Sequence, residues 1–338
     1  MLVNRPFVAG VRVVLSFMLA VVLVAGAFVA PTSAQTSSTS TTNSANTLKV
    51  SPVRSDVQIK AGESSTVPIT ITNLTSQDIL VAGIENDFIQ GDENGTPSLI
   101  LDANEYAPTH SLKRFMTPLG NVKVPAKGAA TVEVKITVPA TAQAGGYFGA
   151  LRFAPTTPES GGQVNLSASV ASLILLTVPG PTTEKLDLTE FTIKQGDKAA
   201  TDFRTPNDLK ASFRFENKGN IQQGPFGKIS VRQGDKVVYD YDFNNKTPRD
   251  VILPDGARRW EVPLKNIGDF GYYTINATFT YGSKNQSIDV ERSFWVIPMA
   301  YIIGAIAAVV VLIGFIVWLI FLLRGRKRRR ARRVHRRR

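Results

Sequence analysis

Apolar and polar residues alternate with a period of two through much of residues 48–295. Every second residue is apolar from Val132 to Val138, and the same holds from Val67 to Ile71. This alternation is typical of β-strands with one face in a core and the other in water. Almost no segment of this region has the 3.6-residue period of a helix. The pattern therefore predicts an all-β region.

Three signals recur in the same order in both halves of this region. They are an asparagine that ends an apolar strand, a Pro-x-Gly type of turn before a strand, and a glycine followed by aromatic residues. The first copies are Asn73, Pro125–Gly128 and Gly146-Tyr147-Phe148; the second copies are Asn217, Pro254–Gly256 and Gly271-Tyr272-Tyr273. Pro179-Gly180-Pro181 is the sharpest break between them. We therefore expect two tandem Ig-like β-sandwiches, residues 48–179 and 180–295.

The hydrophobic pattern changes completely at the C-terminal end, where residues 296–323 contain no charged side chain. The 25 residues from Met299 to Leu323 would form about 38 Å of helix, against about 30 Å for the hydrocarbon core of a bilayer. We therefore predict one transmembrane helix, residues 296–323. Aromatic and basic residues near its two ends are expected at the membrane interfaces: Trp295, Tyr301, Trp318 and Arg324.

Residues 324–338 carry 11 Lys and Arg residues, which predicts a cytoplasmic tail and an ectodomain on the outside. At the other end, residues 1–34 resemble a secretory signal, with Arg5 and Arg12 before an apolar segment and small residues before Gln35. An uncleaved anchor is the alternative, and it gives the same topology. Residues 35–47 are a Ser/Thr-rich tract that we interpret as a flexible stalk.

Charge and composition narrow the function further. Outside the tail and the N-terminal segment, 26 basic residues face 27 acidic ones, so binding to nucleic acid through a basic surface is not expected. The chain has no cysteine, which excludes cysteine nucleophiles and cysteine metal sites, and suggests a bacterial surface protein. No nucleophile elbow, phosphate-binding loop or metal-spaced histidine cluster is present. We expect a protein without enzymatic activity and without a cofactor.

The longest irregular stretch, residues 88–121, is the candidate binding loop, because long loops on a rigid sandwich often carry binding sites. Tyr106, His110, Arg114 and Phe115 lie close together in it and offer aromatic faces and an Arg fork for a sugar or a peptide. The alternative is that these residues only tie the loop down. Within the same stretch, Gly91–Gly95 is better explained as a hairpin turn than as a calcium loop.

With these features in place, the chain resembles the WxL-interacting proteins of bacterial cell surfaces. The resemblance is carried by the signal, the C-terminal span and five motifs: Pro125–Gly128 with Val132–Pro139, Gly145–Ala150, Asn217–Asn220, Val251–Gly256 and Phe294–Pro298. It implies a membrane-distal domain that binds peptidoglycan and a membrane-proximal domain that binds a surface protein partner. The protein would then link the membrane to the cell wall.

A second reading follows from the predicted sandwiches alone. Sandwiches with exposed edge strands can accept a strand from a partner protein, which would make the chain a chaperone-like or structural surface scaffold. A long unpaired edge strand would favour this reading. A concave, aromatic-lined surface near residues 88–121 would favour wall binding.

Overall fold

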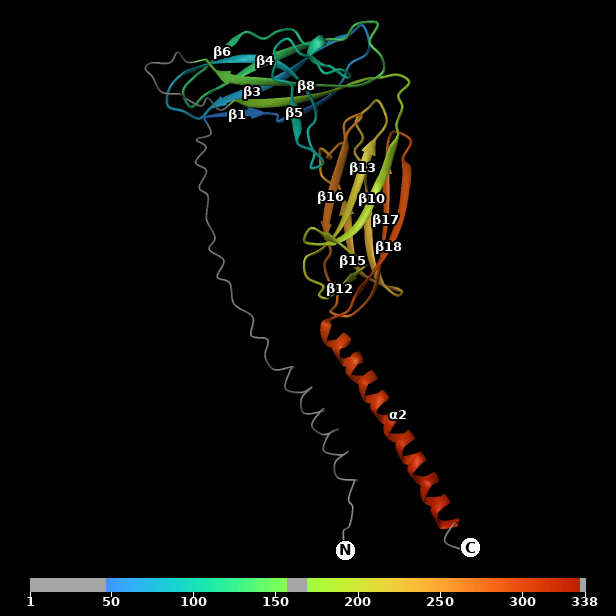
Figure 1. The fold of residues 1–338 in the computed structure, drawn as a ribbon. Coiled ribbons are helices and arrows are strands. Elements are labelled where there is room, and N and C mark those ends of the chain that lie inside the picture. The colour runs from blue at the N-terminus through green and yellow to red at the C-terminus, as the bar shows by residue number, and fades with distance from the viewer. Residues whose placement is uncertain (1–46, 157–168, 335–338) are drawn as a thin grey trace. The chain divides into compact units, whose positions relative to one another are not determined.

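The computed structural model describes residues 47–156 and 169–334 (Figure 1). In these residues, strands continue as far as Val296 and are followed by one long helix. The predicted signal, nearly all of the Ser/Thr tract and the last four residues lie outside the described residues. Both sandwiches belong to the same compact unit of the chain.

The first sandwich packs a three-stranded sheet against a six-stranded one. The smaller sheet has the order β1 (Leu48–Ser51), β3 (Ser64–Asn73), β7 (Ala129–Thr137). The larger sheet has the order β2 (Arg54–Gln58), β9 (Val170–Val178), β8 (Gly145–Pro155), β4 (Ile79–Gln90), and β4 pairs further with β5 (Pro97–Leu99) and β6 (Asn121–Val124). The alternating apolar residues of β3 and β7 fill the core, as their period predicts. A short 3₁₀ turn, η1 (Lys113–Phe115), lies between β5 and β6.

The second sandwich has a four-stranded and a five-stranded sheet. The first has the order β11 (Lys198–Ala199), β10 (Leu186–Gln195), β13 (Leu209–Asn217), β16 (Ala257–Pro263). The second has the order β12 (Asp202–Phe203), β18 (Gln286–Val296), β17 (Gly271–Tyr281), β14 (Phe226–Gln233), β15 (Lys236–Phe243). The connection between β9 and β10 contains the Pro179-Gly180-Pro181 break.

The two sandwiches share one topology. The sheet β1-β3-β7 matches β10-β13-β16, and β2-β9-β8-β4-β5 matches β12-β18-β17-β14-β15. In both, the first strand of the larger sheet is short and parallel to its neighbour. Each also has a tyrosine near the start of the equivalent strands β8 and β17 whose hydroxyl bonds back to the preceding loop. The Tyr147 hydroxyl donates to the Gln143 carbonyl (2.9 Å), and the Tyr273 hydroxyl accepts from the Gly268 amide (2.9 Å). This tyrosine corner is an immunoglobulin-fold feature, so the predicted fold class is confirmed.

The repeated asparagine has the same structural role in both sandwiches. Asn73 and Asn217 are fully buried at the ends of β3 and β13. The Asn73 amide nitrogen donates to three backbone carbonyls, and that of Asn217 donates to two. The backbone N–H of each donates to the glycine of the Pro-x-Gly turn, Gly128 or Gly256, at 2.9 Å. Each asparagine therefore joins a strand end to the turn that starts the neighbouring strand.

The glycine-aromatic signal needs a correction of one residue. Gly145 and Gly271 are the first residues of β8 and β17, with φ of 153° and 155°, and they pair with the last residues of β9 and β18. Gly271 therefore corresponds to Gly145 and not to Gly146. The aromatic side chains suggested the other alignment, whereas the unusual backbone at the strand start fixes this one.

The core of the second sandwich is built around aromatic rings. Phe243 has its ring centroid 4.9 Å from that of Phe279, 5.4 Å from Trp260 and 6.2 Å from Phe215. The pairs with Phe279 and Trp260 have interplanar angles of 73° and 69°, near the edge-to-face geometry that aromatic rings prefer, and the pair with Phe215 is tilted at 40°.

The helix α2 runs from Met299 to Val334 and begins three residues later than the expected start at residue 296. Val296 is instead the buried last residue of β18, and Pro298 precedes the first helical turn. The segment Met299–Phe321 is long and apolar enough to cross a membrane, and none of it is buried inside the protein. The helix continues beyond this segment into the basic sequence.

Candidate functional site

Two of the four predicted loop residues meet at the surface of the first sandwich. The Arg114 guanidinium carbon lies 4.7 Å from the centre of the Tyr106 ring, and the Lys113 ammonium lies 4.8 Å from the same ring. Tyr106 is 44% exposed. Lys113 also donates to the carbonyls of Ala103 and Glu105, which fixes the loop beneath the ring. Tyr106 and Arg114 are therefore accessible to a ligand.

The other two loop residues turn towards the sandwich. His110 Nδ1 is 2.6 Å from the Gly146 carbonyl, and the His110 carbonyl accepts the Phe148 amide at 2.8 Å. The Phe115 ring lies 4.8 Å from that of Tyr147. Because β4 pairs with β8 only up to Gly149, the loop fills the place beside the start of β8. His110 and Phe115 thus hold the loop against the sheet, and the four predicted residues do not form one surface.

Three consecutive polar residues of β4, which the sequence reading missed, anchor this loop. Asp87 is fully buried and accepts the amides of Ala107 (2.9 Å) and Lys113 (2.8 Å). Asn86 donates to the Ile100 carbonyl, and Glu85 accepts the Leu119 amide. The available signal was a run of three polar residues inside an otherwise apolar strand.

Gly91–Gly95 is a hairpin turn between β4 and β5, as predicted. Asp92 closes it by accepting the amides of Asn94 and Thr96, and the Thr96 bond in particular lowers the pKa of the Asp92 carboxyl. The next residue, Glu93, has a partly exposed side chain that contacts the second sandwich. We name residues 92–95 the hairpin tip.

The hairpin tip binds the edge of β16. The Arg259 amide donates to the Glu93 carbonyl (2.6 Å), and the Glu93 carboxylate accepts from Arg214 Nε (2.6 Å) and Arg259 Nε (3.0 Å). The hydrogen bond from Arg214, with further help from Arg259, holds the pKa of Glu93 below its usual value. Arg259 also donates to Glu190 (2.8 Å). The first part of the candidate binding loop is therefore used within the chain itself.

In the described residues, the equivalent edge of the first sandwich is covered at the end of β7, where Met116 bridges Ile136, and is open before it. Gly128 accepts the Asn73 amide on the β3 side, and Lys135 accepts the Thr117 amide on the outer side. Because antiparallel strands direct alternate residues to opposite sides, Ala129, Thr131 and Glu133 direct their N–H and C=O groups outwards. In residues 47–156 and 169–334, these three have no backbone partner on that side.

One pair of residues distinguishes the two edges. Arg259 faces Arg214 across the β13–β16 ladder, and at the equivalent place in the first sandwich Thr131 faces Thr70. The two threonine hydroxyls are 2.9 Å apart and bond to each other. The arginine pair attracts the Glu93 carboxylate, whereas the threonine pair offers no charge to it.

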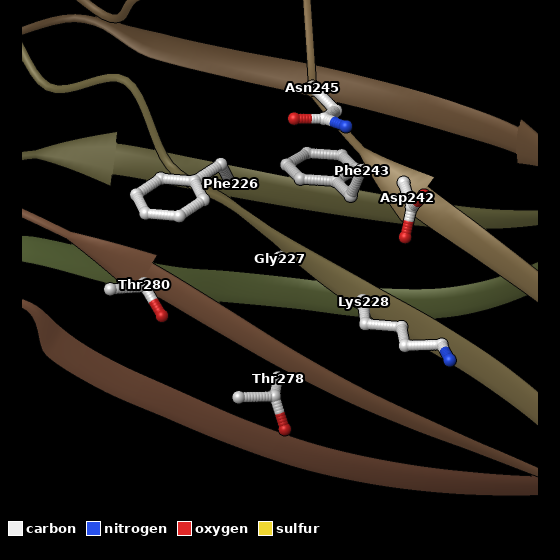
Figure 2. Close-up of a pocket in the computed structure, with 8 residues that line it drawn as sticks. All are labelled: Phe226, Gly227, Lys228, Asp242, Phe243, Asn245, Thr278 and Thr280. Carbon is white, nitrogen blue, oxygen red and sulfur yellow. The ribbon is translucent and has the colours of Figure 1, made fainter.

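The second sandwich also carries a pocket of about 290 Å³ over β14, β15 and β17 (Figure 2). Gly227 lies in its middle, where a Cβ would come within 1.9 Å of the Thr278 carbonyl. Around it are aromatic, hydroxyl, amide and charged groups: Phe226, Lys228, Asp242, Phe243, Asn245, Thr278 and Thr280.

The residues expected at the membrane interfaces lie on β18 and α2. Trp295 is the penultimate residue of β18 and packs on Tyr272, with ring centroids 4.8 Å apart. Tyr301 and Trp318 are exposed on α2. The side chain of Arg324 lies outside the described part of the chain.

Comparison with known proteins gives only distant similarities. No family model and no curated protein matches the chain. Among solved structures, it is similar to the class 5 fimbriae chaperone CfaA, with 13% identity over 75% of this chain and 100% of that one and a TM-score of 0.37. The E. coli chaperone DraB has 14% identity over 74% and 98%, with a TM-score of 0.32. A structure of the Salmonella enterica SafA pilin with the SafB chaperone has 12% identity over 74% and 95%, with a TM-score of 0.35. TM-scores this low leave the function to be argued from the residues.

Proposed function

We propose that the protein is a membrane-anchored, non-enzymatic surface scaffold that binds an extended segment of a partner protein by adding it as a strand to the open edge of β7. The observation that carries this is the row of outward N–H and C=O groups at Ala129, Thr131 and Glu133. An added strand would satisfy these groups with a regular ladder, as in other β-augmentation complexes. Each such hydrogen bond contributes about 0.5–1.5 kcal/mol net, so the full row contributes several kcal/mol.

Two other long edges, those of β16 and β15, are less suited to a partner strand. The β16 edge already holds the hairpin tip. The β15 edge is interrupted by a bulge opposite Val231 and Arg232, and Asn266 donates to its Val238 carbonyl (3.4 Å). Asp240 and Asp242 lie within the remaining part of this strand and place two carboxylates there. Bulges and charges of this kind protect natural edge strands from pairing.

Replacing Thr131 by proline tests the proposal, because proline removes one outward N–H and leaves the ladder to β3 unchanged. In cells that produce the full chain, a photo-reactive residue at Glu133 is expected to cross-link to a second protein. Thr131→Pro should suppress that product strongly. The matched control, Asp240→Pro on the β15 edge, should leave it unchanged.

Two results would contradict strand addition at β7. One is a cross-linked product at Glu133 that persists undiminished in Thr131→Pro. The other is a product that forms only when the photo-reactive residue is moved to Tyr241 on β15.

Binding to wall polymer by the first sandwich is a second candidate, which the resemblance to WxL-interacting proteins implies. It is favoured by one observation, the exposed Tyr106 ring stacked on Arg114. Such a pair can place an aromatic face and an Arg fork on a sugar or an amide. Double replacement Tyr106→Ala/Arg114→Ala should then reduce co-sedimentation with insoluble peptidoglycan, whereas Tyr241→Ala should not. Equal pelleting of both variants would remove this candidate.

The anchor in both proposals is α2. The uncharged segment Met299–Phe321 and the basic sequence after it support a single span with the sandwiches outside and the tail in the cytoplasm.

A further inference from the structure

Exposed aromatic side chains gather at the end of the second sandwich from which α2 starts. Phe270, Tyr272 and Trp295 are 49%, 47% and 43% exposed. Tyr272 packs on Trp295 with ring centroids 4.8 Å apart, and Phe270 stacks on Tyr301 of α2 at 4.9 Å. We name these four residues the aromatic seat.

The sheet register places the seat independently of the helix. Tyr272 pairs with Trp295 and Gly271 pairs with Val296, so Phe270 lies beside the first residues after β18. The same outer face is polar further along these two strands, where hydroxyl, amide and carboxylate groups bond across the ladder: Thr274 with Ser293, Asn276 with Glu291, and Thr278 with Asp289. Aromatic residues on this face are thus confined to the end that leads into α2.

The distances bring the seat within reach of a bilayer surface. The 23 residues Met299–Phe321 form about 35 Å of helix, slightly more than the roughly 30 Å of hydrocarbon, so Met299 would lie at its boundary. Trp295 is four residues earlier, and an extended chain covers at most about 3.5 Å per residue. The headgroup layers add about 5–7 Å on each side. Tyr301 lies just inside this boundary and Phe270 stacks on it, so the seat reaches the depth where Trp and Tyr are enriched.

We propose that the aromatic seat inserts into the interfacial layer of the membrane and forms a second attachment of the ectodomain, separate from the span. We assign the bilayer as the partner of the aromatic seat because the apolar helix begins at Met299, three residues after the end of β18, on the same side of the sandwich as the seat. Without the seat, the covalent link through Ile297-Pro298 would be the attachment of the sandwich to the span. Insertion of rings from two further segments, the loop before β17 and β17 itself, fixes its orientation on the membrane.

The test uses the full chain in vesicles of phosphatidylcholine brominated near the headgroup, compared with unbrominated lipid. The background carries Trp295→Phe and Trp318→Phe and keeps Trp260, which packs inside the sandwich and emits equally in all variants. Phe270→Trp then reports on the seat, with Tyr272→Trp as a second reporter. The control is Lys284→Trp, in the β17–β18 turn at the opposite end of β17, roughly 33 Å away at 3.3 Å per residue.

Loss of Phe270→Trp or Tyr272→Trp emission in brominated lipid, with no loss for Lys284→Trp, is the expected result. Quenching of both seat reporters that is no greater than that of Lys284→Trp would overturn the proposal and leave the rings to a protein partner. The proposal rests on α2 spanning the bilayer. A variant that keeps Trp318 but carries Trp295→Phe tests the span alone. Quenched Trp318 with unquenched seat reporters would refute the seat and retain the span.

Discussion

Asn217→Ala is expected to destabilise the second sandwich by about 3 kcal/mol while leaving the first unchanged. The substitution leaves the carbonyls of Ile221 and Ile252 and the amide of Gly219 without their side-chain partner. The Ile252 carbonyl keeps the Gln223 amide, and each buried polar group that is left without a partner costs about 1–3 kcal/mol. Hydrogen exchange measured by mass spectrometry on the intact chain resolves the two sandwiches, and faster exchange is expected in β13 and β16 alone.

The repeat supplies the reciprocal experiment. Asn73→Ala should accelerate exchange in β3 and β7 and spare the second sandwich, because its three carbonyl partners all belong to the first. Asn207→Ala, at an exposed asparagine, is the control and should change stability by no more than about 0.5 kcal/mol. Equal effects of Asn217→Ala on both sandwiches would show that they unfold as one unit and that the asparagine is not a local tie.

Phe243→Ala is expected to have the largest effect of any single substitution considered, about 3–5 kcal/mol on the second sandwich. The side chain is 1% exposed and lies against several aromatic rings, so its removal opens a cavity that rigid neighbours cannot fill. Urea unfolding followed by Trp260 fluorescence measures the loss. Tyr241→Ala, two residues along the same strand and partly exposed, should cost less than half as much; equal losses would mean that the ring cluster contributes little beyond ordinary burial.

The sequence predicted the features whose cause is local. The alternation in Val132–Val138 depends only on the period of a strand, and the fold class followed from several such segments. The pairing of an asparagine with a Pro-x-Gly turn was recognisable because both copies keep the same order of residues. Even so, the aromatic residues suggested a register one residue away from that of Gly145 and Gly271.

Contacts between distant residues could not be predicted in this way. Glu93 and Arg214 are 121 positions apart, and the ion pair between them depends on how one sandwich meets the edge of the other. That the His110 and Phe115 side chains turn towards the sheet could not be predicted either, because it depends on β4 ending its pairing with β8 at Gly149. Asp87 was overlooked for the same reason: its partners at 107 and 113 reach it only after the loop has folded back.

The contrast between the arginine pair and the threonine pair has a consequence for any protein built from two copies of one domain. Two equal edges would compete for the same hairpin, and the chain would then block either of them at random. Here the hairpin tip with Glu93 matches the β16 edge with its arginine pair. Because both belong to one chain, the tip has a high local concentration at that edge. The hairpin tip therefore occupies the β16 edge and leaves the β7 edge to the partner strand that we propose.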